Sequence, residues 1–346
     1  MDNSDTRRLG ALPTATGGIA RLAYARVEQA GIEVGPLLNK AGLTAAQIKD
    51  PGVRINVQHQ ITFLNLAARA LQDDLLGFHL AQQVDLREIG LLYYVLASSE
   101  SLAEALRRGA RYSSIVNEGI SLTLFEGRDV AMTFDYVGVA RHLDRHQIEF
   151  WMTIVIRLCR QLVGLRLAPL RVRLTHRSNS NISEFAALLG EDIEFGARVD
   201  EVAFAVTAKD MQVVSADPYL NSLLNTIFEE ALSRRPTNRA SFQVVVENAI
   251  APLLPHGKAR AAEISRRLCM SQRTFSRRLS LEGLTFSEAL ENVRRDLVER
   301  YLTDQGLSIS QIAWLLGYQE VSAFTHAFKR WTGRTPRAAR AQREWA

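Results

Sequence analysis

The fold of the C-terminal third is decided by one stretch, Ile312-Ala-Trp-Leu-Leu-Gly-Tyr-Gln-Glu-Val-Ser-Ala-Phe-Thr-His-Ala-Phe-Lys329. Its apolar residues recur at helical spacing on both sides of a glycine, which predicts a short helix, a turn and a second helix. Phe324 and Phe328 stand four residues apart and therefore share one face of the second helix. A helix braced by a partner in this way can lie in the major groove of DNA. The stretch therefore predicts a helix-turn-helix unit.

A looser copy of this pattern lies earlier, in Ile264-Ser-Arg-Arg-Leu-Cys-Met-Ser-Gln-Arg-Thr-Phe-Ser-Arg-Arg-Leu279. Phe275 aligns with Phe324, and Leu279 then aligns with Phe328. The turn of the later copy is one residue longer. We therefore expect two helix-turn-helix units, each held together by an apolar pair at positions i and i+4 of its second helix.

The outward faces of the two second helices carry polar side chains of the kinds that contact base edges and phosphates. The residues expected to contact DNA are Gln272, Arg273, Ser276 and Arg277 in the first unit and Ser322, Thr325, His326 and Lys329 in the second. An arginine that pairs bidentately with guanine contributes ~1–3 kcal/mol against the wrong base. Lys329 is assigned to phosphate, and the role of His326 is left open between DNA contact and structure.

The segment between the two reading helices predicts how far apart they lie. Thr285 to Leu302 has a helical pattern and begins with the capping-box sequence Thr285-Phe-Ser-Glu288. A helix of this length spans about 27 Å, and one turn of DNA is about 34 Å. One chain could therefore reach two successive major grooves. The helix N-termini after Thr285 and Ser308 are further candidates for phosphate contacts.

Charge is distributed unevenly along the chain. Residues 1–235 hold 25 Lys and Arg against 27 Asp and Glu, a net of −2, and residues 236–346 hold 17 against 10, a net of +7. A positive charge confined to one end favours a polyanionic partner for that end. The polar, proline-containing run Ser233–Arg239 precedes the change. We therefore divide the chain into a disordered start (1–17), an effector-binding and dimerisation domain (18–232), a linker (233–239) and a DNA-binding domain (240–346).

Periodicity predicts an α+β sensor domain in the front part, followed by an all-α domain with the two helix-turn-helix motifs. The expected helices of the front part are 18–31, 37–40, 45–49, 57–71, 75–83, 101–116, 146–164, 181–190 and 221–232, and the expected strands are the hairpin 120–136, 170–175 and 202–206. The tail is expected to form helices at 242–254, 259–268, 272–281, 285–302, 308–316, 321–332 and 337–344.

The tail resembles a known family over about residues 240–344. The run from Gly317 through Phe324, Phe328 and Lys329 to Gly333-Arg-Thr335-Pro336 is similar to the signature of the AraC/XylS family of transcriptional regulators, and Met270–Leu279 matches that family's first reading helix. His326 stands where many members have arginine. The resemblance implies a sequence-specific regulator that binds double-stranded promoter DNA and works with RNA polymerase, with activation more typical than repression.

The front part resembles the arabinose-binding-like N-terminal domain of one AraC branch over about residues 18–210. The resemblance rests on Gly31–Leu43, Asp50–Ile55, Leu76–Leu80 and Gly90–Leu106. It implies a small-molecule effector whose identity is unknown, since members of this architecture respond to varied metabolites. It also leaves a homodimer open, in which case the operator would be a direct or inverted repeat.

The effector pocket is expected where the hairpin faces the following helix. Tyr136, Arg141, His146 and Trp151 are the candidate residues. His142 and His146 are spaced i, i+4, but no third ligand stands at a recognisable spacing, so no metal site is expected. No cofactor is expected either. Trp314 and Trp331 are expected in the core.

The remaining observations concern compartment and chemistry. The first residues lack the apolar core of a secretion signal, and no apolar run approaches the ~18–20 residues that cross a bilayer, so a cytoplasmic protein with no membrane contact is expected. The two cysteines, Cys159 and Cys269, are far apart and are not expected to pair. No catalytic motif is present, which argues against an enzyme. The alternatives are an architectural DNA binder without sequence preference and an enzyme domain fused to a DNA-targeting tail.

Overall fold

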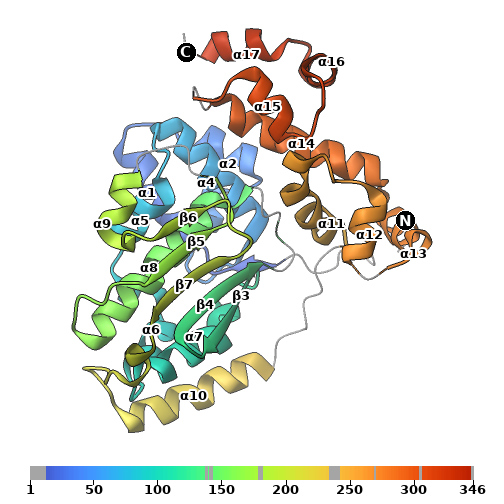
Figure 1. Cartoon of the computed structure of the whole chain (residues 1–346). Coiled ribbons are helices and arrows are strands. Elements are labelled where there is room, and N and C mark those ends of the chain that lie inside the picture. Colours follow the sequence, from blue (N-terminus) through green and yellow to red (C-terminus); the bar gives the residue numbers. More distant parts are fainter. Residues whose placement is uncertain are drawn as a thin grey trace, which may run out of the picture. The chain divides into compact units, whose positions relative to one another are not determined.

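The computed structural model describes residues 13–136, 139, 143–177, 182–233, 242–268, 270–303 and 306–343. The chain forms two compact units, residues 1–139 with 144–239 and residues 240–346 with 140–143. The first unit combines a mixed sheet with helices, and the described part of the second is helical throughout (Figure 1). The predicted fold class, α+β followed by all-α, is confirmed.

The sheet of the first unit has the order β3-β4-β7-β5-β6 within the described residues. Its strands are β3 (Ile120–Glu126), β4 (Asp129–Tyr136), β5 (Arg171–Leu174), β6 (Ile193–Phe195) and β7 (Asp200–Ala205). β3 and β4 form the predicted antiparallel hairpin, with Ile120 opposite Tyr136, whereas β6 pairs in parallel with β5. β6 was not predicted, because a run of three residues is too short to show an alternating pattern.

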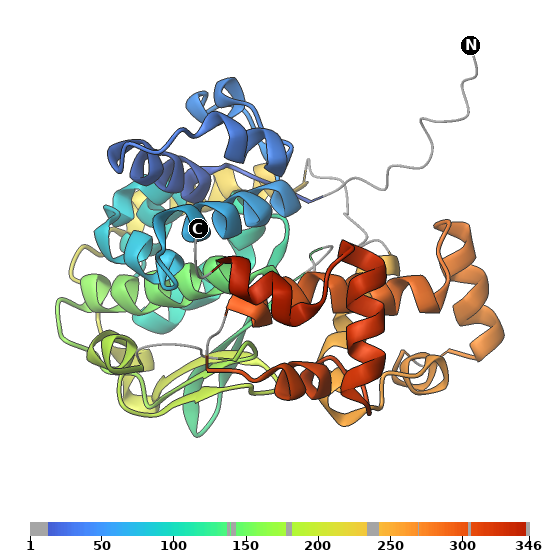
Figure 2. The ribbon, with the colours of Figure 1, turned by 90° about the horizontal axis from the view of Figure 1, so that it is seen from above.

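Two helices, α7 (Leu102–Val116) and α8 (Arg145–Val163), pack against one face of this sheet. Along β3, Leu122 and Leu124 are half-buried while Ser121 and Thr123 are exposed, as expected for a strand with one covered face. Figure 2 shows α8, in green, between the sheet and the blue N-terminal helices. The buried residues of strands and helices form one continuous apolar core.

Helix α5 (Leu76–Gln83) packs on α8 at very short range. A Cβ atom added at Gly77 would lie only 1.9 Å from the carbonyl oxygen of His146. The two backbones therefore approach more closely than any side chain would allow, and position 77 requires glycine.

The other elements of the first unit largely follow the predicted helical segments. They are β1 (Thr14–Ala15), α1 (Gly18–Gln29), α2 (Gly35–Ala41), α3 (Ala45–Lys49), β2 (Ile55–Asn56), α4 (Val57–Leu71), α6 (Leu91–Ala97), α9 (Ile182–Leu189), α10 (Pro218–Ser233) and the 3₁₀ segments Leu86–Ile89 and Val206–Asp210. Helix α6 was not predicted, because its continuous apolar run shows no period that separates helix from strand.

The predicted disordered start, residues 1–17, is too long. β1 pairs antiparallel with β2, and the Glu118 carboxylate accepts hydrogen bonds of 2.8 Å from the backbone N–H and the hydroxyl of Thr14. Arg54 donates to the Thr14 hydroxyl oxygen as well, at 2.7 Å. These long-range partners order residues 14–15, and sequence pattern alone gave no sign of them. Residues 1–12 of the predicted start lie outside the described residues, as does most of the predicted linker.

The second unit consists of short helices around one apolar core. They are α11 (Phe242–Ile250), a 3₁₀ segment (Ala251–His256), α12 (Ala261–Arg267), α13 (Gln272–Leu281), α14 (Phe286–Thr303), α15 (Ile309–Leu315), α16 (Val321–Thr332) and α17 (Pro336–Arg343). The first was predicted to run to Leu254 but ends four residues earlier, since Pro252 and Pro255 cannot continue an α-helix. In the part of the chain that the structure describes, no helix has the length and apolarity needed to cross a membrane.

Candidate nucleic-acid interface and ligand cavity

The first helix-turn-helix unit consists of α12 and α13, which contact each other. Phe275 and Leu279 of α13 are 0% and 1% exposed and lie in the core of the second unit. Ser271 caps the N-terminus of α13, because its hydroxyl oxygen accepts a hydrogen bond from the Thr274 N–H at 3.2 Å. The predicted inner face of this helix and its bounds, Gln272–Leu281, are both found.

The second helix-turn-helix unit, α15 and α16, repeats this arrangement. Phe324 and Phe328 are buried, with ring centres 6.0 Å apart. Four residues separate α12 from α13 and five separate α15 from α16, so the later turn is one residue longer, as predicted. Ser308 and Gln311 form a reciprocal capping box at the start of α15.

The residues predicted to contact DNA lie on the outer sides of α13 and α16. Gln272, Arg273, Ser276 and Arg277 are exposed in α13, and Ser322, His326 and Lys329 are exposed in α16, with Thr325 half-buried. The Thr325 hydroxyl donates to the Val321 carbonyl at 2.9 Å. The structure thus gives each reading helix an exposed polar face opposite its buried apolar pair.

Helix α14 joins the two helix-turn-helix units, with α12 and α13 near one of its ends and α15 and α16 near the other (Figure 1). It has 18 residues, which corresponds to about 27 Å. Arg294 of α14 donates to the carbonyl oxygens of Leu316 (2.9 Å) and Gly317 (3.3 Å) at the end of α15. A connecting-helix side chain therefore satisfies carbonyls that the end of α15 leaves open.

The turn of the second helix-turn-helix unit depends on Gly317. Its φ is 75°, and an added Cβ would lie 2.6 Å from the Leu254 carbonyl oxygen. Both the left-handed conformation and the close approach of another backbone segment require glycine here. This explains why the glycine sits at the turn of the stretch that predicted the motif.

In the first helix-turn-helix unit, Glu282 binds backbone groups at a helix end, as Arg294 does in the second helix-turn-helix unit. Its carboxylate accepts hydrogen bonds of 2.7 Å from the backbone N–H groups of Phe242 and Gln243, at the start of α11. The negative charge at a helix N-terminus is favourable. Neither Glu282 nor Arg294 was singled out from the sequence, because both act on backbone groups far away in the chain.

The two predicted phosphate-binding helix starts differ in charge. At the start of α14, the Glu288 carboxylate accepts hydrogen bonds from the N–H and hydroxyl of Thr285, both at 2.7 Å, which lowers the pKa of Glu288. A carboxylate at this position opposes the approach of a phosphate. The start of α15 carries the neutral Gln311 instead, and is the better of the two candidates.

The two tryptophans expected in the core have different surroundings. Trp331 is half-buried and its indole N–H donates to Glu291 of α14. Trp314, in contrast, is 54% exposed, so its prediction as a core residue is wrong. It stands two positions after the buried Ile312, about 200° further around α15, and therefore faces away from the core.

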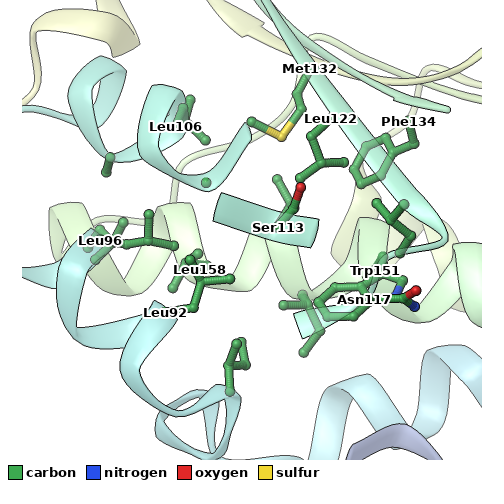
Figure 3. A pocket seen from close by; sticks show the side chains of 17 residues that line it. Leu92, Leu96, Leu106, Ser113, Asn117, Leu122, Met132, Phe134, Trp151 and Leu158 are labelled. Atoms are coloured by element: carbon green, nitrogen blue, oxygen red, sulfur yellow. The ribbon is translucent and has the colours of Figure 1, made fainter. Parts of the chain in front are cut away.

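A cavity in the first unit lies between the sheet and helices α6, α7 and α8, with a volume of about 50 Å³ open to the centre of a water-sized sphere. Apolar side chains from these elements point into it (Figure 3), among them Leu92, Leu96, Leu106, Leu122, Met132 and Phe134. One water needs about 10–15 Å³, and an apolar cavity of about 150 Å³ binds benzene, so this cavity is smaller than one that holds benzene.

Of the four predicted pocket residues, Trp151 lines this cavity. Tyr136 and His146 are not among its lining residues, and Arg141 lies outside the described residues. His146 stands five residues before Trp151, about 140° away around α8, so the two side chains face different neighbours.

His146 lies instead beside a buried carboxylate. Glu149 is 1% exposed, accepts a hydrogen bond from Arg145 at 2.8 Å and lies 3.3 Å from Nε2 of His176. His146 Nδ1 is 3.8 Å from the same carboxylate. Among the residues that the structure describes, no group of three or more His, Cys, Asp or Glu side chains is arranged to hold a metal ion.

Sequence reasoning missed three polar or small residues of the cavity, Gly109, Ser113 and Asn117. Gly109 lies inside α7, where glycine costs about 1 kcal/mol relative to alanine. A Cβ added there would meet only Leu96, at 3.7 Å, which is ordinary contact. The isolated glycine inside an otherwise helical pattern was the available signal.

Comparison with known proteins agrees with this division of the chain. Residues 31–213 match the family model of the arabinose-binding domain of AraC transcription regulator, N-terminal, and residues 264–342 match a helix-turn-helix domain. An uncharacterised HTH-type transcriptional regulator of Mycobacterium tuberculosis is 26% identical over 320 residues, which cover 88% of this chain and 90% of the relative. The HTH-type transcriptional regulator VirS of the same species is 27% identical and covers 81% of this chain and 83% of its own. The ornithine utilization regulator of Pseudomonas aeruginosa is 24% identical, with 93% and 96% covered.

Proposed function

Because the chain belongs to the family of AraC transcription regulators with an arabinose-binding-type N-terminal domain, we propose that it activates transcription from promoters that its two helix-turn-helix units read in sequence. Under this proposal, a small molecule bound by the first unit changes how the second unit engages DNA and RNA polymerase. We also propose a cytoplasmic location, where the promoter DNA would be reached.

The observation that carries the proposal is that α13 and α16 have the same arrangement of buried and exposed side chains. Each helix buries an apolar i, i+4 pair and exposes a polar face on its other side, and α14 joins the two. Such faces supply both base and phosphate contacts. A purely architectural binder has no need for two copies of a groove-reading helix.

Within the interface, we assign different tasks to the exposed residues. Arg273 and Arg277 read bases or phosphates of the first half-site, and Lys329 contacts phosphate in the second. His326, exposed on α16, supports a contact that depends on hydrogen bonding rather than on a permanent charge. Gln272, Ser276, Ser322 and Thr325 complete the two faces.

Footprinting of the full-length protein on its upstream promoter, followed by fluorescence anisotropy on the protected duplex and on random DNA at matched salt, tests the proposal. We expect Arg273→Ala and Arg277→Ala each to weaken binding to the protected site by about 5- to 150-fold, the equivalent of one bidentate pair. Binding to random DNA should change much less.

The matched control is Arg26→Ala, which removes an exposed arginine from α1 of the first unit and should leave both affinities unchanged. Equal losses on cognate and random DNA, together with equal affinity of the parent protein for both, would favour the architectural alternative. Turnover of a metabolite by the full chain, with no protected promoter site, would favour the enzyme alternative.

Effector control and partners need their own measurements. Transcription in vitro with purified RNA polymerase distinguishes activation from repression. Sedimentation over a range of concentrations tests whether the chain forms a homodimer, in which case the footprint should contain a direct or inverted repeat.

A further inference from the structure

Helices α15, α16 and α17, which lie together at the top of Figure 1, surround a hollow of about 540 Å³ on the surface of the second unit. The polar residues of its lining are Thr325, Thr335, Arg337 and Arg340. None of the lining residues, all of which the structure describes, is acidic. A hollow with positive charge on its walls and no negative charge attracts an anion.

The hollow adjoins the face of α16 that is proposed to read DNA. Thr325 belongs to both, since it is one of the residues of that face and also lines the hollow. Lys329, which is assigned to phosphate, stands one helical turn after Thr325. The Thr325 hydroxyl already donates to the Val321 carbonyl, so Thr325 forms wall and leaves the donation to other residues. A duplex that α16 reads would therefore have its backbone beside this hollow.

The two arginines of the hollow differ in how they can act. Neither forms an ion pair within the described part of the chain. Nη1 of Arg340 donates to the Leu307 carbonyl at 2.7 Å, and its Nε and Nη2 are covered from solvent. Arg340 is thus fixed in the wall and acts through its charge alone. Arg337 is exposed, so its guanidinium can donate hydrogen bonds directly to an anion.

The corresponding place in the first helix-turn-helix unit is closed by a carboxylate. Thr285 and Thr335 stand at matching places after the two reading helices, and each hydroxyl oxygen accepts a hydrogen bond of 3.3 Å from the N–H three residues later. After α13 that later residue is Glu288, whose carboxylate binds back to Thr285. After α16 it is Ala338, which has no such group. The second unit therefore lacks the negative charge that would repel a phosphate.

From these observations we propose that the hollow between α15, α16 and α17 holds a backbone phosphate of the DNA that α16 reads. Arg337 donates to this phosphate, and Arg340 adds charge from the wall. Helix α17 is then a third DNA-contacting element, and the second half-site is held by a contact that the first half-site lacks. This proposal extends the function proposed above and rests on it.

Fluorescence anisotropy of the full-length protein at several salt concentrations, on the protected duplex and on random DNA, tests the contact. We expect Arg337→Ala to weaken binding to both duplexes by about 3- to 10-fold at 0.1 M salt. It should also reduce the slope of log affinity against log salt by about 1, the value for one phosphate. In ethylation interference, Arg337→Ala should lose one sensitive phosphate in the half-site that α16 reads.

A second variant adds the missing carboxylate to the hollow. Ala338 is exposed, and Ala338→Glu places an acidic group where α14 has Glu288. The new side chain can form a capping box with Thr335 and should keep the unfolding midpoint at or above that of the parent. It should nevertheless weaken binding to both duplexes at least about threefold, because it repels the phosphate. The control is Ala46→Glu, the same substitution in the first turn of α3, which Thr44 caps in the first unit.

Unchanged affinity and salt slope in both Arg337→Ala and Ala338→Glu would overturn the proposal. So would a loss in Arg337→Ala that is confined to the protected duplex and leaves the salt slope unchanged, since Arg337 would then read a base. A parent protein that binds neither duplex refutes the regulator itself. A parent protein that discriminates between the duplexes, together with variants that behave like it, refutes only the phosphate site.

Discussion

The guanidinium carbon of Arg294 lies 4.3 Å from the centre of the Tyr318 ring. The same guanidinium donates hydrogen bonds to the carbonyl oxygens of Leu316 and Gly317. It therefore caps the C-terminal end of α15 and also stacks on the Tyr318 ring in the turn that follows. One side chain of the connecting helix thereby fixes the second helix-turn-helix unit. Only the planar guanidinium can make all of these contacts at once.

Replacing Arg294 should destabilise the second helix-turn-helix unit without changing the exposed polar face of α16. We expect Arg294→Ala to lower the free energy of unfolding by about 2–3 kcal/mol, from two hydrogen bonds and a cation–π contact. Arg294→Lys should lose somewhat less, because it keeps the charge but not the bidentate geometry. Denaturant titration measures both, and Arg295→Ala, an exposed neighbour on α14, is the control and should stay within ~0.5 kcal/mol of the parent.

Among the described glycines of the first unit, Gly77 has the closest atom to an added Cβ. Gly77→Ala places a Cβ only 1.9 Å from the His146 carbonyl oxygen, so α5 and α8 must separate. We expect a loss of about 3 kcal/mol or more in the free energy of unfolding. Gly35→Ala, at an exposed glycine with nothing near its added Cβ, is the control. A small loss at Gly77 would mean that the helices separate easily.

The elements predicted best are those whose local pattern and tertiary role agree. The bounds of α13 and α16 match the prediction, because a capping serine or a turn glycine stands before each helix and an apolar pair fixes its inner face. The exposed positions of the reading faces follow from the same period. Local sequence is sufficient here because both units are built from neighbouring residues.

The cavity and the joints between helices could not be predicted in the same way. Gly109 of α7, Asn117 just after that helix and Trp151 of α8 line one cavity only in the folded unit. The backbone approach at Gly77 depends on α8, some 70 residues later in the chain. Choosing His146 with Trp151 failed because the two residues face different sides of α8. The prediction that hairpin and helix enclose a pocket agrees with the cavity between these elements, but of the three described candidates only Trp151 lines it.

Cys159 should be inert in the folded protein. It is 0% exposed on α8, and burial raises the pKa of its thiol to about 12. At pH 8 only about one molecule in ten thousand would then carry the reactive thiolate. In a Cys269→Ser background, we expect a thiol-specific chromogenic disulfide reagent to react with one thiol in denaturant and with none in buffer. Rapid labelling of the native protein would show that α8 opens often.

His79 of α5 links two carboxylates from different segments. Its Nδ1 lies 2.9 Å from Asp73 and its Nε2 lies 2.7 Å from Glu184 of α9. Burial by itself would lower the pKa of His79, but the hydrogen bonds and charges of Asp73 and Glu184 outweigh it, so the pKa is raised above its usual 6.5. The charged imidazolium is therefore the form that holds α9 against α5.

The sign of the pH dependence follows from this raised pKa. The extra stability is fully present below the pKa of the unfolded chain, near 6.5, and disappears as the pH rises through the higher pKa of the folded state. We expect His79→Gln to lower the unfolding midpoint more at pH 6 than at pH 9. Glu184→Gln should bring the pKa of His79, followed by NMR, back toward its usual value, whereas Glu191→Gln, an exposed carboxylate just beyond α9, should not. A difference between parent and His79→Gln that stays constant from pH 6 to pH 9 would mean that the neutral imidazole makes the contact equally well.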